Sequence, residues 1–185
     1  MRQNEIAQLH LADIKQVKDG TWVFDVNNLG DRRTKTDPSQ RLVPVHPFLL
    51  EELNFLGLIN SLSDEGYDRL FPEIKAGRHS YGAAVSKWFN ARFKHKIELE
   101  VDQRDRWKDF HSFRKTFSSY LLHKDIPDKK VKQVVGHSIG GDILNRNYFD
   151  KFKGKKLRDE VILEIDFHKL IDLFHLKSSK WVPKS

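Results

Sequence analysis

His111 and Arg114 lie three residues apart in a segment whose apolar residues recur with a helical period. At that spacing, two side chains project from neighbouring parts of one helix face. A guanidinium presents a planar fork of donors, and an imidazole is a donor that can also move a proton. The pair therefore suits a bound phosphate group. The alternative is an exposed His and Arg on an ordinary amphipathic helix, so other residues must decide between the two.

Four further residues could complete a site of this kind, namely Arg2, Lys35, His137 and Tyr148. Each of them also has a plain structural interpretation. Lys35 can be a solvated lysine in a basic loop, and Tyr148 can be a core tyrosine beside Leu144. His137 follows a helix-ending glycine and can simply cap a helix C-terminus. Only the joint order and spacing of these residues can favour a catalytic interpretation.

The segment that carries His111 and Arg114 is predicted to be a helix with Asp109 as its N-cap and an end near His123. Its apolar residues follow the i, i+4, i+7, i+8 pattern of one helix face. The residues expected to face the core are Phe113, Phe117, Tyr120 and Leu121. A helix held in this way would present the imidazole and the guanidinium on its opposite face.

A small antiparallel sheet is predicted upstream of this helix. Ile14–Val17 and Thr21–Val26 have strand-like composition and are separated by an Asp-Gly turn, which is a strong hairpin signal. Arg41–Val45 is predicted to be a third strand at the sheet edge, because Pro44 has no N–H to donate. The polar stretch between the second and third strands contains Lys35, which is therefore expected near a turn.

Further helices are predicted on both sides of these segments. They are expected over 2–9 and 47–59, over 81–94, from Asp125–Pro127 to a stop at Gly136, over 142–152, and around Leu157, Val161, Ile162 and Ile165. The fourth of these has an Asp cap, Pro in its first turn and Gly just past its end, which is the usual asymmetry. The segments 60–80 and 97–108 are expected to be irregular.

Composition limits the classes of function. The 185-residue chain has a net charge of +7, which favours a polyanionic partner such as nucleic acid, although a merely basic soluble protein fits equally well. It contains no cysteine, so thiolate metal sites and cysteine nucleophiles are excluded. The nine histidines show no metal-binding spacing, and no membrane span or signal peptide is visible. We therefore expect a soluble cytoplasmic protein that needs no metal or cofactor.

In their order and spacing, the candidate residues resemble the catalytic set of the tyrosine recombinases, the phage integrase family. The segments that carry the resemblance are Arg2-Gln3-Asn4-Glu5-Ile6-Ala7-Gln8-Leu9, Thr34-Lys35-Thr36 ahead of Arg41-Leu42-Val43-Pro44-Val45-His46, His111-Ser112-Phe113-Arg114, Val135-Gly136-His137-Ser138 and Asn147-Tyr148-Phe149. Each motif is weak alone, but five in order over about 150 residues are specific. One departure is the spacing from His137 to Tyr148, a residue or two longer than is usual in the family.

The resemblance implies a role for each residue. The catalytic set would be Arg2, Lys35, His111, Arg114, His137 and Tyr148, with Glu5 at the supporting acidic position. The arginines and histidines would donate to the non-bridging oxygens of a DNA phosphate, with His111 also assisting the nucleophile. Tyr148 would form a 3′-phosphotyrosyl bond, and Lys35 would protonate the leaving 5′-oxygen. Lys115 and Lys132 could contact the DNA backbone, although a solvated basic face explains them equally well.

The resemblance also implies a fold and a domain plan. We expect an α+β domain, mostly α-helical with a small three-stranded antiparallel sheet, similar to the tyrosine recombinase catalytic domain. It would occupy residues 1–165 without the family's upstream helices and DNA-clamping domain, and 166–185 would form a C-terminal tail. Double-stranded DNA is the expected partner, with self-association on DNA into a tetrameric synapse. The last helix is expected either to dock on a neighbouring protomer or to fold back over the first helix.

The function implied is site-specific recombination, in the integration or excision of a phage or genomic island in a bacterial cell. A type IB topoisomerase, which uses similar chemistry, and a non-catalytic DNA-binding remnant remain as alternatives.

Overall fold

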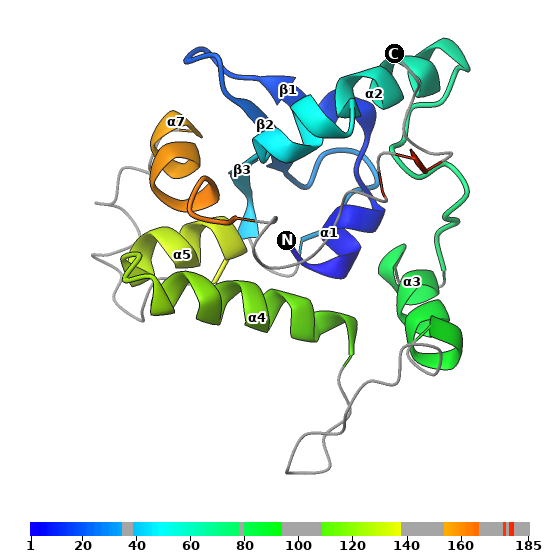
Figure 1. The fold of residues 1–185 in the computed structure, drawn as a ribbon. Helices are drawn as coiled ribbons and strands as arrows, with labels where there is room; N and C mark the ends of the chain where they lie inside the picture. Colours follow the sequence, from blue (N-terminus) through cyan, green and yellow to red (C-terminus); the bar gives the residue numbers. More distant parts are fainter. Residues whose placement is uncertain are drawn as a thin grey trace.

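The computed structural model describes residues 1–34, 39–77, 80–93, 109–137, 154–166, 176 and 178–179. The predicted helix over 142–152, and with it Tyr148, lies outside the described residues, as does Lys35. Within the described part the chain is a mixed, mainly helical domain with one small antiparallel sheet, as predicted (Figure 1).

The described α-helices are α1 (Gln3–Ala7), α2 (Phe55–Asp64), α3 (Gly82–Trp88), α4 (Phe110–His123), α5 (Asp128–Val135) and α7 (Gly154–Leu157). Shorter helical turns are η1 (Leu11–Asp13), η3 (Phe48–Glu52), η4 (Phe89–Phe93) and η5 (Arg158–Ile162). The strands are β1 (Ile14–Gln16), β2 (Trp22–Val26) and β3 (Arg41–Pro44).

The sheet has the order β1-β2-β3, and both strand pairs are antiparallel. Gly20, at φ 81°, makes the turn between β1 and β2. In the register, Phe24 pairs with Ile14 on one side and with Val43 on the other. The predicted strands and their hairpin are therefore confirmed, with bounds that differ by a residue or two.

One apolar cluster joins the sheet to the C-terminal helices, which Figure 1 shows along one side of the strands. Its buried members are Val26, Val43, Leu121, Val131, Val134, Leu157, Val161, Ile162 and Ile165. The stripe predicted for the last helix thus packs into the core of this same chain and does not form an exposed face. Met1 packs against this cluster too, whereas Leu9, just past the first helix, lies in the second cluster.

A second apolar cluster lies on the side of the sheet covered by α2 (Figure 1). Two predictions about this region were wrong. The helix expected over 47–59 is interrupted at Asn54, which has a left-handed φ of 45°. Helix α2 then continues to Asp64, into the segment expected to be irregular, because Phe55, Leu58, Ile59 and Leu62 form one apolar face against the sheet.

Helix α4 begins and ends where predicted, but its faces differ from the prediction. The Asp109 side chain accepts a hydrogen bond from the Ser112 backbone N–H at 3.1 Å, so Asp109 is the N-cap. Leu121 is fully buried, whereas Phe113 is 58% exposed and Arg114 is buried. The helix is therefore turned so that the guanidinium of Arg114 enters the interior.

Helix α5 also differs at its start. Pro127, and not Asp125, is the N-cap, and Asp125 has a left-handed φ of 58° just before it. The predicted end is confirmed, because Gly136 at φ 72° stops the helix. Among the described residues, no helix is long and apolar enough to span a membrane.

Candidate active site

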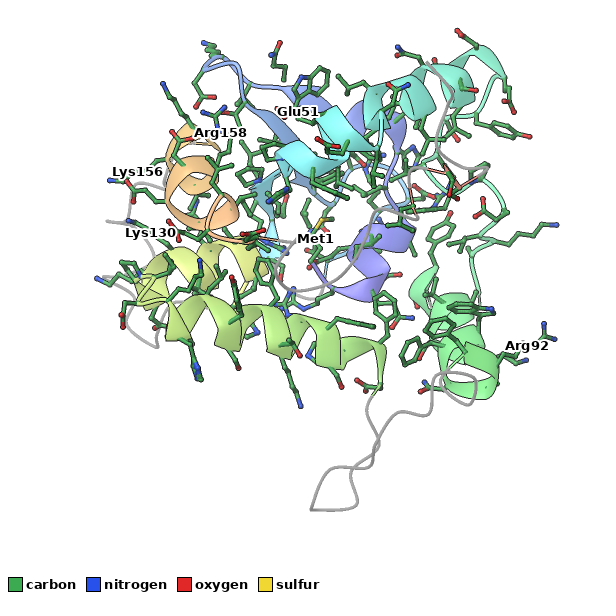
Figure 2. The ribbon with its side chains drawn as sticks, in the orientation of Figure 1. Met1, Glu51, Arg92, Lys130, Lys156 and Arg158 are labelled. Carbon is green, nitrogen blue, oxygen red and sulfur yellow. The ribbon has the colours of Figure 1, made fainter. Side chains whose placement is uncertain are left out.

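Arg2 lies just ahead of α1 and connects three parts of the chain. Its Nη1 donates to Glu5 Oε1 at 2.7 Å and to Ser39 Oγ at 2.9 Å. Its Nη2 donates to the backbone carbonyl of Gly136 at 2.8 Å. The backbone N–H of Arg2 donates to Glu5 Oε2 at 2.6 Å, so one carboxylate holds both the helix start and the side chain. Met1, labelled in Figure 2, lies where this helix begins, between the sheet and α4.

Glu5 is 2% exposed and shares its carboxylate between Arg2 and Arg41. Arg41 Nη2 donates to Glu5 Oε2 at 2.8 Å, and its Nη1 lies 3.2 Å from Oε1. Burial alone would raise the pKa of Glu5, but the hydrogen bonds and charge of Arg41 and the bonds from Arg2 lower it to about 2. Glu5 is therefore a buried anion at neutral pH.

Arg41 was not among the residues singled out from the sequence. It is 5% exposed, and its Nε donates to the carbonyl of Val134 at 2.8 Å while its Nη1 donates to that of Ser39 at 2.7 Å. The signal that could have found it is an arginine that opens an otherwise apolar strand, because a buried charge requires partners. Such a pattern shows that partners exist but does not identify them.

Arg114 is 7% exposed, yet its Nε, Nη1 and Nη2 have no hydrogen-bond partner in the part of the chain that the structure describes. Burial lowers its pKa to about 10, with the positive charges of Arg2 and Arg41 adding to that effect and Glu5 opposing it. A buried guanidinium without partners is energetically costly. The described part of the chain therefore leaves all of its donors unused, and an anionic group placed beside them would satisfy them.

His111 and His137 are exposed and lie beside the positive charges of Arg2 and Arg114. His137 directly follows Gly136, whose carbonyl accepts from Arg2. Partial desolvation and the positive charges of Arg114 and Arg2 lower the pKa of His137, and His111 contributes to the same effect. A neutral imidazole is therefore favoured at His137 in the free protein.

The structure thus brings Arg2, Glu5, Arg114, His111 and His137 into one region, as their order in the motifs predicts. Lys35 and Tyr148, the expected acid and nucleophile, lie outside the described residues. Arg41 and Ser39 are added to the site as partners of Arg2 and Glu5.

The lysines proposed to contact DNA have different surroundings. Lys115 is exposed on α4, whereas Lys132 forms an ion pair with Asp128 one turn earlier, at 2.5 Å. Other basic side chains on α5, α7 and η5 are also paired with carboxylates; Figure 2 labels Lys130, Lys156 and Arg158. The net positive charge of this surface is therefore smaller than its count of lysines indicates.

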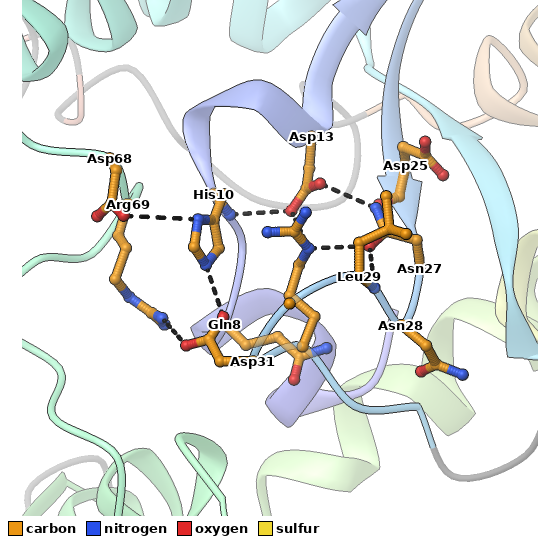
Figure 3. Close-up of polar contacts among 12 residues, drawn as sticks. Gln8, His10, Asp13, Asp25, Asn27, Asn28, Leu29, Asp31, Asp68 and Arg69 are labelled. Carbon is orange, nitrogen blue, oxygen red and sulfur yellow. Dashed lines mark hydrogen bonds and ion pairs between the residues drawn. The ribbon is translucent and has the colours of Figure 1, made fainter.

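A second polar network fixes the segment that leads from β2 toward Lys35 (Figure 3). The Asp31 carboxylate accepts hydrogen bonds from Tyr81 Oη at 2.5 Å and from Arg69 Nη1 at 3.1 Å, and it is hydrogen-bonded to His10 Nε2 at 2.9 Å. The hydrogen bond from Tyr81 is the main cause that lowers the pKa of Asp31 to about 2. The network joins this segment to His10 at the start of η1 and to Tyr81 just before α3.

In the same segment, the side-chain amide of Gln8 forms two bonds with the backbone of Arg33. Gln8 Oε1 accepts from the Arg33 N–H at 2.9 Å, and Gln8 Nε2 donates to the Arg33 carbonyl at 3.0 Å. Thr34, the next residue, donates its N–H to Asn28 Oδ1 at 2.6 Å. Among the described residues, no group of three or more His, Asp or Glu side chains is placed to hold a metal ion.

Comparison with known proteins identifies the class. Residues 1–154 match the model of the phage integrase family, and the chain belongs to that family. One curated relative is "Probable autophagy-related protein 17" of Dictyostelium discoideum, which is 30% identical over 103 residues, 54% of this chain. The matched part spans 21% of that protein's length, and so small a share assigns no function. No solved structure matches the chain significantly.

Proposed function

We propose that this chain is the catalytic part of a tyrosine-type site-specific DNA recombinase. The observation that carries the proposal is the buried guanidinium of Arg114, whose three nitrogens have no partner in the described structure and which lies beside Arg2 and His137. Such a group fits an anion that approaches from outside the protein. A DNA phosphodiester is an anion of this kind, and the family match and the net charge of +7 support it as the substrate.

Stabilisation of the transition state would be the main work of the cationic residues. Attack on a phosphodiester passes through a pentacoordinate phosphorus whose non-bridging oxygens carry more negative charge than in the substrate. Arg114 can donate to these oxygens through its planar fork, with Arg2, His111 and His137 as further donors. Removal of one such preorganised donor typically slows a reaction by about 10²–10³.

In the proposed reaction, Tyr148 Oη forms a bond to phosphorus while the bond from phosphorus to the 5′-oxygen breaks. The tyrosine proton passes to His111, and Lys35 donates a proton to the leaving oxygen, so the step is balanced. The product is a 3′-phosphotyrosyl enzyme and a free 5′-hydroxyl. Because the covalent bond conserves the energy of the phosphodiester, a second 5′-hydroxyl can attack and rejoin the strand.

The biological setting belongs to the same proposal. The enzyme would integrate or excise a phage or genomic island on bacterial DNA in the cytoplasm, within a tetrameric synapse. Residues 1–165 would form the catalytic domain and 166–185 its tail. The family match and the basic charge support DNA as the partner.

The test is covalent trapping on a nicked suicide duplex, from which the cleaved strand diffuses away before religation. Incubation with the 185-residue chain should give a protein–DNA adduct that survives denaturation, and Tyr148→Phe should give none. If the wild-type chain binds the duplex without forming an adduct, the result would favour the alternative of a non-catalytic DNA-binding protein. Relaxation of supercoiled DNA without site preference would instead identify a type IB topoisomerase activity.

A further inference from the structure

The guanidinium of Arg41 lies at the meeting point of three segments that are far apart in the sequence. It donates to both carboxylate oxygens of Glu5 on α1, at 3.2 and 2.8 Å. It also donates to the carbonyl of Ser39, just before β3, and to the carbonyl of Val134, near the end of α5. Each of these segments carries a group of the proposed phosphate site or leads directly to one.

The link to Arg2 is direct on two sides. Glu5 Oε1 accepts from both Arg2 Nη1 and Arg41 Nη1, so the two guanidinium groups share one carboxylate oxygen. Ser39 is shared in the same way, because its carbonyl accepts from Arg41 while its hydroxyl accepts from Arg2. A displacement of the Arg41 guanidinium would therefore remove support from Arg2 in two places.

The link to His137 runs through Gly136. Gly136 has a left-handed φ of 72°, which already favours glycine, and it also lies against Arg41. A Cβ built at Gly136 would lie 2.6 Å from Arg41 Cζ and 2.6 Å from Nη1, closer than such atoms approach. Glycine at position 136 therefore leaves the space that the Arg41 guanidinium occupies beside the corner before His137. The same guanidinium donates to the carbonyl of Val134, two residues earlier.

We infer that Arg41 is a positioning residue that holds Arg2 and the corner before His137 in the arrangement that binds the scissile phosphate. The inference rests on the proposed function for its consequence in catalysis. An arginine is required because its planar fork bonds a carboxylate and two carbonyls in different directions at once. A lysine offers a single charged point and cannot make all of these bonds.

The arrangement predicts a specific response to pH. The charged or titratable groups that face Glu5 are Arg2 just ahead of its helix, Arg41 on β3, Arg114 on α4 and the amino group of Met1, whose pKa burial and the charge of Arg41 lower to about 5. Of these, Arg41 makes the strongest contribution to keeping the buried carboxylate ionised. Without Arg41, burial dominates, Glu5 takes up a proton more readily, and a protonated Glu5 holds Arg2 less well.

The test uses the 185-residue chain with Arg41→Met, Arg41→Lys, Glu5→Gln and the double variant Glu5→Gln/Arg41→Met. Single-turnover cleavage of the suicide duplex is measured from about pH 4.5 to pH 8, and the Glu5 carboxyl carbon is titrated by NMR over the same range. Arg158→Met is the matched control, because the Arg158 side chain is partly exposed and bonds only its neighbour Asp159 among the described residues.

In Arg41→Met we expect the pKa of Glu5 to rise by at least about two units and cleavage to gain an acid limb that follows the same titration. The double variant should lack this limb, since it has no Glu5 carboxyl to titrate. Arg41→Lys should keep Glu5 ionised and still cleave more slowly than wild type, because a lysine leaves at least one carbonyl unbonded. Arg158→Met should behave as wild type.

Two results would overturn the inference. One is an Arg41→Met chain whose Glu5 titrates as in wild type or whose cleavage has no acid limb. The other, which decides the matter if Arg41→Met does not fold, is an Arg41→Lys chain with the wild-type rate. If the wild-type chain itself forms no adduct, the proposed function fails, and the Glu5 titration still tests whether Arg41 holds this carboxylate ionised.

Discussion

The side chain of Arg2 donates a hydrogen bond to the backbone carbonyl of Gly136, which lies 134 positions later in the chain, at 2.8 Å. The first arginine of the site is therefore bonded to the corner from which His137 emerges. Arg2 uses its Nη1 and Nη2 on the protein, whereas Arg114 uses none of its nitrogens in the described structure. Of these two cations, Arg2 is held by other residues of the chain, whereas Arg114 has all of its donors unpaired among the described residues.

This difference predicts opposite effects on stability for two buried arginines. Arg114→Met should leave the free energy of unfolding unchanged or raise it, because no hydrogen bond is lost and the repulsion from Arg2 and Arg41 is relieved. Arg41→Met should lower it by about 3–5 kcal/mol, since it leaves the buried Glu5 carboxylate without its main partner. Urea denaturation at neutral pH measures both changes.

Arg114→Met should affect the rate of cleavage without lowering the stability of the fold. Arg114→Met should slow adduct formation by at least about 10²-fold while the chain stays folded, because the lost donor acts on the phosphate. A loss of several kcal/mol in Arg114→Met would instead identify Arg114 as a structural brace whose partner lies outside the described residues.

His137 gives a prediction about pH. In the free protein, desolvation and the charges of Arg114 and Arg2 hold its pKa below the ordinary value, so the imidazole is mainly neutral at pH 7. A phosphate bound beside it would raise that pKa, and binding would take up a proton. Affinity for duplex DNA should therefore rise as the pH falls from about 8 to about 6 at constant salt, through the pKa that His137 has in the complex.

Fluorescence anisotropy with a labelled duplex measures this dependence. His137→Gln should flatten it, and His123→Gln, a change at an exposed histidine at the end of α4, should leave it as in wild type. An equal slope in wild type and His137→Gln would assign the proton uptake to another group.

The local elements of this fold could be predicted because their signals are local. The Asp-Gly hairpin, the Asp109 cap and the glycine stop at Gly136 are each set by a few neighbouring residues, and the structure has all three. The helix break at Asn54 was missed, because asparagine adopts left-handed φ often enough to end a helix but gives no clear sequence signal.

The site could be predicted only in part, for a different reason. The order of motifs predicted that Arg2, His111, Arg114 and His137 would come together. Nothing local indicates that Arg114 enters the interior or that Phe113 stays exposed, because both follow from how α4 is turned against the rest of the core. Arg41 was missed because its partners come from segments on both sides of it, up to 93 positions away.

The lysines provide a prediction about salt. Lys115 is exposed, so its contact with a DNA phosphate would release a counterion fully, whereas Lys132 must first give up its ion pair with Asp128. Lys115→Ala should lower the slope of log K against log salt by about one, and Lys132→Ala should lower it by less. Titrations with one duplex at several salt concentrations measure both slopes. Equal slopes for wild type and Lys115→Ala would place Lys115 away from the DNA.

Gln8 provides the last prediction, because its amide holds the backbone two residues before the proposed acid Lys35. Gln8 is 3% exposed, and both of its bonds to Arg33 are to the main chain. Replacement by leucine keeps the volume but removes both bonds, so the segment that carries Lys35 would lose its attachment to the helix that follows Arg2. We expect Gln8→Leu to slow cleavage by roughly tenfold, since each lost bond is worth about 1 kcal/mol.

A modified substrate identifies the step that is affected. A duplex with sulfur in place of the bridging 5′-oxygen has a leaving group that needs little protonation, because a thiol is far more acidic than an alcohol. On this substrate Lys35→Ala and Gln8→Leu should both recover most of the wild-type rate, while Arg114→Met should not. Gln16→Leu is the control, because the side chain of that exposed glutamine bonds only the carbonyl of Gly20 among the described residues. Recovery in Lys35→Ala without recovery in Gln8→Leu would show that Gln8 supports the fold and not the acid.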